Sequence, residues 1–132
     1  EIRVCDVPMN FSQILGLVAL IQALVVTLEQ ENPYPATHIQ ILESNKWQAA
    51  RYGLDGVFVD PLTIRKLTIR KSIENLCEFI EPTSTYLGST KYIRIIEEIL
   101  SKGTGAIKQK ELFKSSGNFE YMIKSVKDQF YQ

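Results

Sequence analysis

Two charged residues at the start of the chain, Glu1 and Arg3, are the first candidates for chemistry. They alternate with apolar residues, which is the pattern of a half-buried strand, so both would lie on one strand face about 6.6 Å apart. A carboxylate there can bind Mg²⁺, which prefers oxygen ligands, and a neighbouring guanidinium can form paired hydrogen bonds with a phosphate. The alternative is an exposed ion pair that contributes about 0–1 kcal/mol to stability.

A second candidate group lies in residues 45–53, Asn-Lys-Trp-Gln-Ala-Ala-Arg-Tyr-Gly. On a helix, Trp47 and Arg51 lie one turn apart, so the guanidinium could rest on the indole ring. Gly53 suits the left-handed position that follows a helix end. The structural interpretation is therefore a helix terminus with a cation–π contact, and it stands beside the interpretation of these residues as a binding site.

Other kinds of site find little support in the sequence. His38, Cys5 and Cys77 are too few for a zinc site built from the usual ligands, and no phosphate-binding loop or Gly-x-Gly-x-x-Gly motif is present. The turn at 103–105 is typical of helix punctuation. Fifteen basic residues balance fifteen acidic ones, which argues against binding to nucleic acid or an anionic membrane. Cys77 falls on an apolar helical stripe, as a reduced core thiol would, so a cytoplasmic location is expected.

The elements that must position these residues are mostly helical. We expect a fold of the α+β class, with short extended segments and a single undivided unit over residues 1–132. Pro82 is expected to end the third helix. A repeated Leu-Thr-Ile-Arg-Lys at 62–71 is too short to be a structural repeat. The predicted elements are a strand at 1–6, an extended arm at 57–59, and helices at about 11–30, 37–53, 68–80, 89–102, 106–115 and 118–130.

The first helix contains the longest apolar run of the chain, residues 14–28. Gln22 interrupts this run, and a membrane-spanning helix needs about 20 apolar residues. No basic segment precedes the run as in a signal peptide. We therefore predict a core helix that is buried on several sides, and no membrane partner.

The sequence resembles the glutamate–cysteine ligase type 2 family of carboxylate–amine ligases. The most specific segment is 45–55, which is similar to the family's Asn-(Arg/Lys)-Trp-x-Ala-x-Arg-(Tyr/Phe)-Gly stretch. Residues 1–6 resemble its Glu-x-Arg-x-x-Asp strand, and 103–110 resemble its Gly-x-Gly-Ala-x-Arg-Gln-Arg element. Lys108 and Lys110 stand where the family favours arginine, and lysine lacks the planar fork that binds phosphate. We therefore assign these two lysines no phosphate role.

The resemblance implies a glutamine-synthetase-like catalytic domain of which this chain is the C-terminal part. Such enzymes activate a carboxylate, typically that of glutamate, by phosphorylation from ATP and Mg²⁺, and an amine then displaces the phosphate. Glu1 matches the family's metal-binding carboxylate. Arg3 matches its phosphate-contacting arginine, which implies a catalytic and ATP-binding role. Asn45 and Arg51 would lie near the bound nucleotide and substrates, in roles the resemblance does not assign.

Two functional interpretations remain open. In the first, the chain is part of a ligase and inactive alone, because its site needs the missing N-terminal part of the same protein. The partners would then be a glutamate-like carboxylate and an amine, and apolar surface around Ile2, Val4 and the first helix would be exposed or buried by self-association as a homo-oligomer. In the second, the chain is a small helical module that keeps ligase-derived sequence and binds another protein.

Overall fold

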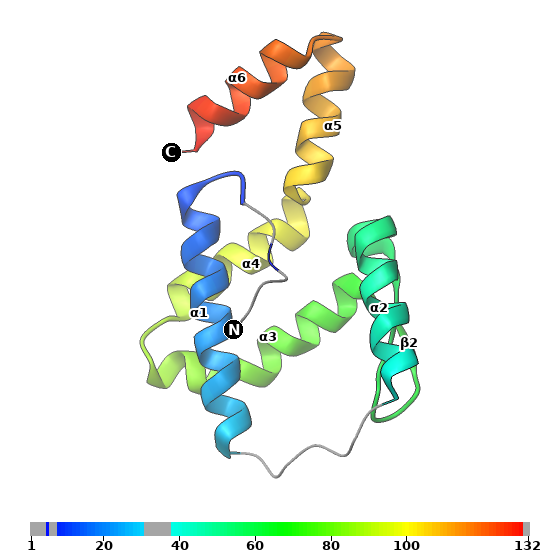
Figure 1. Ribbon diagram of the computed structural model, residues 1–132. Helices are drawn as coiled ribbons and strands as arrows, with labels where there is room; N and C mark the ends of the chain where they lie inside the picture. The colour runs from blue at the N-terminus through cyan, green and yellow to red at the C-terminus, as the bar shows by residue number, and fades with distance from the viewer. Residues whose placement is uncertain (1–4, 6–7, 31–37, 131–132) are drawn as a thin grey trace.

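A computed structural model describes residues 5, 8–30 and 38–130 of the chain. The predicted strand at 1–6 lies outside the described residues, except for Cys5, which belongs to no helix or strand. The described part is mostly helical with one small antiparallel sheet, so the α+β expectation is confirmed (Figure 1). Its elements are α1 (Phe11–Gln30), α2 (Ile39–Tyr52), a 3₁₀ turn (Gly53–Asp55), β1 (Val57–Val59), β2 (Lys66–Thr68), α3 (Ile69–Tyr86), α4 (Thr90–Lys102), α5 (Gly105–Ser116) and α6 (Phe119–Gln129).

The helical body is formed by α1 packed against α3 and α4. A narrow stripe of small residues on α1 makes this contact: Gly16, Ala19, Ala23 and Thr27 are all buried. At Gly16 a methyl group would come within 3.2 Å of the Ile95 Cβ atom and of a backbone oxygen on α4, so glycine permits the close approach of the two helices. The main apolar cluster follows from this packing and comprises Ala19, Ala23, Cys77, Ile80, Ile93 and Ile96.

The opposite face of α1 is exposed, so the prediction that this helix is buried on several sides is wrong. Small residues bring α3 and α4 close to one face, which Leu17, Leu20 and Leu24 flank as partly buried residues packed against the core, and other large side chains lie on the exposed face. The predicted exposure of apolar surface on the first helix is thereby confirmed, while Ile2 and Val4 lie outside the described residues. Exposed apolar residues on α1 are Phe11, Leu15, Val18, Val25 and Leu28.

By length and composition, α1 is the one helix in the described part that could cross a membrane, with a mean hydropathy of 2.1. Core helices of globular proteins reach similar values when they pack against other helices. One face of α1 packs against α3 and α4 in this way, but only 28% of the apolar window is buried, because the opposite face is exposed.

Local signals fix several helix ends as the sequence predicts. The Gln13 backbone N–H donates to the Asn10 side chain at 3.0 Å, and the Gln13 side chain accepts from Met9 at 3.0 Å. Gly53 follows α2 with a positive φ of 61°, which favours glycine, but its ψ of −133° lies outside the left-handed helical conformation expected there. Asn118 accepts hydrogen bonds from the backbone N–H groups of Glu120 and Tyr121 at the start of α6.

The prediction that Pro82 ends the third helix is wrong, because α3 continues to Tyr86. Proline removes one hydrogen bond and strains the preceding turn, but contacts of the last turn offset this loss. The Thr27 hydroxyl on α1 lies 2.7 Å from the Thr83 hydroxyl, and the Ser84 carbonyl accepts from the Ser89 backbone at 2.9 Å. Packing against neighbouring elements therefore outweighs the local signal of proline.

The hairpin contains a strand that the sequence pattern missed. β1 and β2 pair antiparallel, with Phe58 opposite Leu67. The first copy of the Leu-Thr-Ile-Arg-Lys repeat, 62–66, forms the turn and the start of β2, and the second, 67–71, completes β2 and begins α3. The two copies have different structures, in agreement with the interpretation of the repeat as coincidence.

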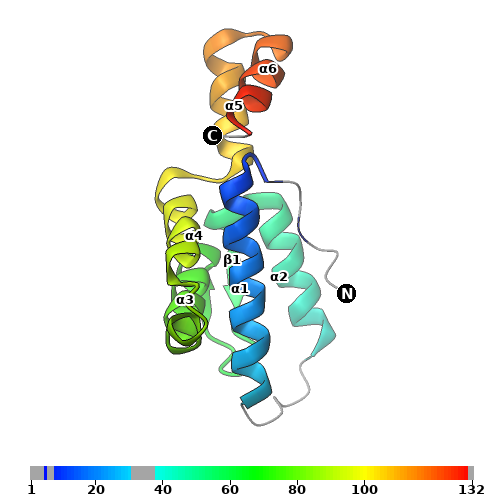
Figure 2. The ribbon, with the colours of Figure 1, turned by 90° about the vertical axis from the view of Figure 1, so that its left-hand side faces the viewer.

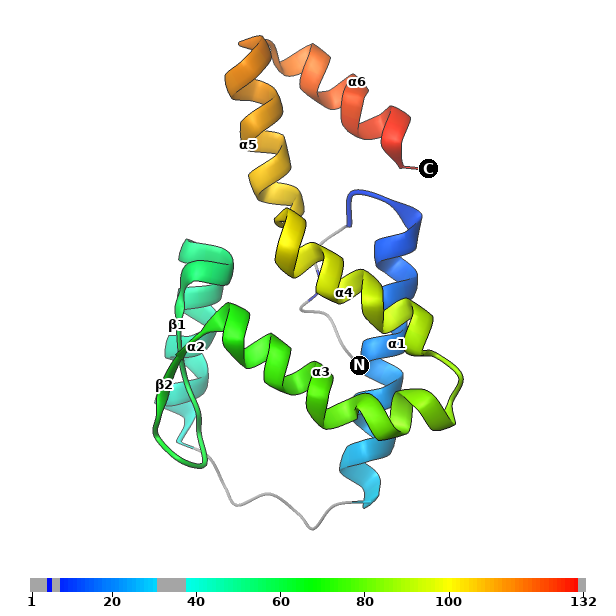
Figure 3. The same cartoon turned by 180° about the vertical axis from the view of Figure 1, so that it is seen from behind.

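α5 and α6 form a helical hairpin that projects from the body (Figure 3). Neither helix has a buried residue. The two helices meet through Phe113 and Phe119, whose ring centroids are 4.3 Å apart. The hairpin returns to the body where the Phe11 backbone N–H donates to the Phe130 carbonyl at 2.9 Å.

Candidate functional site

Asn45 on α2 is fastened to strand β1 through both ends of its amide. Its Nδ2 donates to the Val59 carbonyl and its Oδ1 accepts from the Val59 backbone N–H, each at 2.8 Å. The side chain is buried, and the paired bonds satisfy its polar atoms. Asn45 therefore holds the outer edge of the hairpin against α2. This structural role was not predicted from the sequence.

Gln48, one helical turn later, makes the matching contact two strand residues earlier. Its side-chain oxygen accepts a hydrogen bond from the Val57 backbone N–H at 3.1 Å. The spacing works because residues three apart share a helix face, and alternate strand residues point to the same edge. The role of Gln48 was missed because only the later contact with β1 distinguishes it from other helix residues.

The glycines after α2 complete the same unit. Gly56 has an ordinary φ of −63°, yet a Cβ atom there would lie 2.7 Å from the Gln48 carbonyl oxygen and 2.8 Å from the Ile69 side chain. Only a residue without a side chain lets β1 pass this close to the end of α2. Leu54 is buried between the two glycines. Much of the 45–56 segment therefore builds a tight helix–hairpin junction.

In the described structure, Trp47 and Arg51 do not form the cation–π contact that the helix-end interpretation predicts. Trp47 contacts Tyr52 in an edge-to-face arrangement, with ring centroids 5.6 Å apart and an angle of 81° between the rings. Both rings are more than half exposed. The cation–π contact that the described residues do show is Lys91 over Tyr92, at 4.8 Å. Arg51 lies exposed in the last turn of α2.

The loop between the two strands is ordered by Asp60. Its carboxylate accepts from the backbone N–H groups of Leu62 at 2.8 Å and Thr63 at 3.2 Å. These bonds, aided by the charge of Arg65, hold the pKa of Asp60 below its ordinary value. Ile64 adopts a positive φ of 58° in this loop. The Asp60 side chain is thus engaged in shaping the turn.

Of the other predicted site residues, Glu1 and Arg3 lie outside the described residues, so their roles stay predictions. Lys108 and Lys110 lie on α5, far along the chain from Asn45 and Arg51. Lys108 is half-buried near the start of α1, and its charge helps to lower the pKa of Glu98 after the dominant contribution of Lys102. The described structure places Asn45 and Arg51 on α2 and the two lysines on α5.

An apolar cavity of about 560 Å³ lies between α2, β1 and α3. Asn45 lies at its wall, and Phe58, Leu76 and Phe79 are among the apolar residues that line it. Because the Asn45 amide is already bonded to Val59, this cavity offers little to a phosphate and suits an apolar group.

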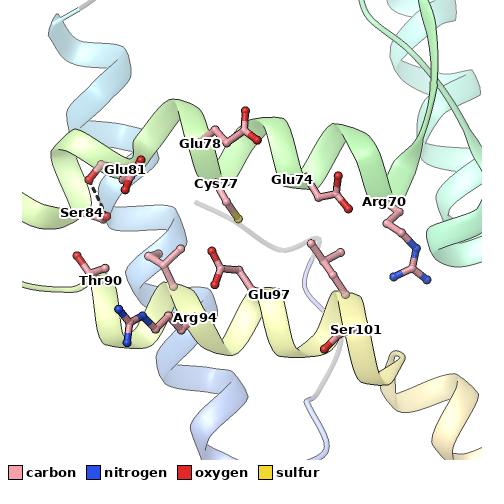
Figure 4. Close-up of a pocket in the computed structure, with 12 residues that line it drawn as sticks. Arg70, Glu74, Cys77, Glu78, Glu81, Ser84, Thr90, Arg94, Glu97 and Ser101 are labelled. Carbon is pink, nitrogen blue, oxygen red and sulfur yellow. Dashed lines mark hydrogen bonds between the residues drawn. The ribbon is translucent and has the colours of Figure 1, made fainter.

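A groove of about 660 Å³ runs between α3 and α4 (Figure 4). The Cys77 sulfur and the Glu97 carboxylate both lie in the gap between the helices, with Arg70 at one end. Its charged lining residues are four carboxylates and two guanidinium groups: Glu74, Glu78, Glu81, Glu97, Arg70 and Arg94. This acidic groove favours ammonium groups over phosphates.

Cys77 is buried in this groove and is not prepared to act as a nucleophile. Burial raises the pKa of its thiol, and the neighbouring charges of Glu97 and Glu78 raise it further. A nucleophilic cysteine needs the opposite shift, because the thiolate is the reactive form. The prediction of a reduced core thiol at Cys77 agrees with its burial in the apolar cluster.

Comparison with known proteins gives a match over almost the whole chain. The family model of Glutamate-cysteine ligase family 2 matches residues 1–128. Three bacterial proteins that carry the name "Putative glutamate–cysteine ligase 2" are similar. The Gloeobacter violaceus protein is 34% identical over 88% of this chain and 32% of its own length. The Solibacter usitatus protein is 33% identical over 93% and 33%, and the Nitrosospira multiformis protein is 32% identical over 89% and 32%. The chain thus spans about a third of the length of the curated relatives it matches.

Proposed function

Because this chain belongs to glutamate–cysteine ligase family 2, we propose that it is one part of an ATP-dependent ligase that joins a carboxylate to an amine. The carboxylate would be that of glutamate or a close analogue. The observation that carries the proposal is the family match over residues 1–128, which includes the Asn45–Asp55 segment. The acceptor amine is open.

The described residues alone do not fit a site for ATP and Mg²⁺. Among them, no group of three or more histidine, cysteine, aspartate and glutamate side chains stands close enough to hold a metal ion. The groove between α3 and α4 carries more carboxylates than guanidinium groups and would repel phosphate. When bound, ATP would supply the phosphate that activates the carboxylate. We derive no catalytic step from the described residues.

The proposed role of the described part is to position the residues that do chemistry. In the sequence, residues 1–6 precede α1, whose start is fixed by the Asn10 cap and by the backbone bond to Phe130. We assign Glu1 to the metal and Arg3 to the phosphate groups, because they match the family's strand residues. Arg51 is exposed at the end of α2 and free to contact substrate or nucleotide, while the Asn45 amide supports its helix. A cytoplasmic setting is part of the proposal.

The experiment is to compare the chain with a ligase chimera, in which residues 1–132 replace the matched third of the Gloeobacter violaceus protein. ADP release is measured with MgATP, glutamate and cysteine, and the amide product is detected by mass spectrometry. We expect turnover by the chimera and none by residues 1–132 alone. A folded chimera without amide product would contradict the ligase proposal, and ADP release by the chain alone would contradict its dependence on the remaining two thirds.

A further inference from the structure

The outer face of α1 carries a continuous stripe of exposed apolar side chains. Phe11, Leu15, Val18 and Val25 retain 52%, 36%, 56% and 56% of their accessible surface. With Gln22 between the last two, these positions follow one another at spacings of four and three residues, so they form one line along the helix. We call this line the α1 outer stripe.

No described element covers the α1 outer stripe. α3 and α4 pack against the opposite face of the helix, which carries Gly16, Ala19 and Ala23. Figure 2 shows α1 at the front of the helical body, with α3 and α4 to one side. The stripe is therefore a separate surface and not an extension of the core.

The composition of the stripe is unusual for a surface helix. Exposed helix faces normally carry charged residues, as α3 and α4 do with the ion pairs Lys71–Glu74 and Lys102–Glu98. In α1 no charged residue occurs from Phe11 to Leu28, and the one polar residue within the stripe is Gln22. An apolar line of this extent on an exposed face marks a contact surface.

The length of the relatives outside the matched segment indicates what could cover the α1 outer stripe. The relatives are about three times as long as the segment matched here, so a ligase of this family has two further thirds of chain that can contact this third. We propose that the α1 outer stripe is the surface on which the remaining two thirds of a ligase of this family docks. This inference rests on the proposed function, but its test does not require that the chimera be catalytically active.

Cysteine labelling tests the proposal with a small thiol-reactive maleimide. Val18→Cys and Val25→Cys are made separately in the chain and in the ligase chimera, each with Cys5→Ser to remove the exposed natural thiol. Tyr86→Cys is the matched control, because Tyr86 is 84% exposed on α3, away from the stripe. Cys77, which is 7% exposed in the folded body, reports on folding, since opening of the body would raise its labelling rate.

We expect positions 18 and 25 to react readily in the chain and at least about tenfold more slowly in the chimera, as for groups that become buried. Position 86 should react at the same rate in both proteins. Equal labelling at 18 and 25 in both proteins, in a chimera whose Cys77 reacts no faster than in the chain, would overturn the proposal. Protection without amide synthesis would support the docking surface and contradict the catalytic proposal alone.

Two further measurements test whether a second copy of the chain or a lipid surface covers the stripe instead. Sedimentation of the chain tests a second copy, and labelling in the presence of phosphatidylcholine–phosphatidylglycerol vesicles tests a lipid surface. We expect a monomer whose position 18 stays reactive with vesicles present. A stable dimer that protects positions 18 and 25, or protection by vesicles, would assign the stripe to those occupants and overturn the proposal.

Discussion

Asn45 on α2 and Val59 on β1 are joined by two hydrogen bonds of 2.8 Å, one in each direction. They lie fourteen positions apart in the chain, and their contact joins the most specific part of the family motif to the hairpin. The Asn45 amide thus supports its neighbours, and Arg51 is one of the exposed residues of this segment, together with Trp47 and Tyr52.

Asn45→Ala should lower the free energy of unfolding by about 1–3 kcal/mol, because both polar groups of Val59 lose a partner at a partly buried site. Gln48→Ala is the matched control. It removes one bond at an exposed position and should cost about 0.5–1.5 kcal/mol. Urea unfolding followed by circular dichroism measures both. Wild-type stability for Asn45→Ala, together with lost turnover in the chimera, would instead assign Asn45 to substrate binding.

Gly56→Ala should destabilise the helix–hairpin junction by about 1–3 kcal/mol, because overpacking forces the backbone to shift. The added methyl would face a carbonyl oxygen at 2.7 Å. Gly88 separates the two causes of a glycine requirement, since it has φ 65° and open space around it. Gly88→Asn should be tolerated better than Gly88→Ala, because asparagine adopts this conformation more readily. At position 56, asparagine should be worse than alanine, and the reverse order would refute the steric explanation.

Pro82→Ala should raise the free energy of unfolding, by up to about 3 kcal/mol, because Pro82 lies exposed inside α3 and removes a helical hydrogen bond. Glu81→Ala, at an exposed neighbouring position, should change stability by no more than about 0.5 kcal/mol. Thermal unfolding provides the comparison. A loss of stability in Pro82→Ala would show that the Thr27–Thr83 contact depends on a bend at the proline.

Stability should decrease in alkaline solution partly because of Cys77. Its folded-state pKa is raised, mainly by burial and then by Glu97 and Glu78, so the unfolded thiol loses its proton first as pH rises. The contribution of Cys77 to the free energy of unfolding is constant while the thiol is protonated in both the folded and the unfolded state. This contribution is lost as pH rises above about 8.5, the ordinary pKa of cysteine.

Urea unfolding between pH 7 and 10 measures this effect, with Cys77→Ala as the comparison. The wild-type chain should lose more stability over this range than Cys77→Ala does. Glu97→Gln should reduce the difference, because it removes one of the charges that disfavour the thiolate. Identical pH dependence in wild type and Cys77→Ala would contradict the effect of burial on this thiol.

The sequence predicted features that depend on neighbouring residues. The Asn10 and Asn118 caps and the turn at Gly53 follow from side-chain chemistry within three or four residues, and each is present. Helix α1 has the predicted bounds, because its apolar run and cap are both local.

Features that depend on distant contacts were missed or misjudged. The helix passes through Pro82 because Thr27, far away in the sequence, supports the next turn. The role of Gln48 depends on its contact with β1. Helix α1 buries a single face, because Gly16 and two alanines allow α4 and α3 to approach closely on that side. The catalytic assignment of Glu1 and Arg3 came from family resemblance, and it stays a prediction because both lie outside the described residues.

Steady-state kinetics of Glu1→Gln and Arg3→Lys in the ligase chimera tests the ligase assignment most directly. Glu1→Gln removes the charge that would hold Mg²⁺, and Arg3→Lys removes the planar fork while keeping the charge. Glu120→Gln, on exposed α6, is the control. We predict that each site variant lowers kcat for amide formation by about 10²-fold or more, with unfolding free energies within about 1 kcal/mol of the parent. Parental kcat in both site variants would contradict the account and leave the pair as surface charges.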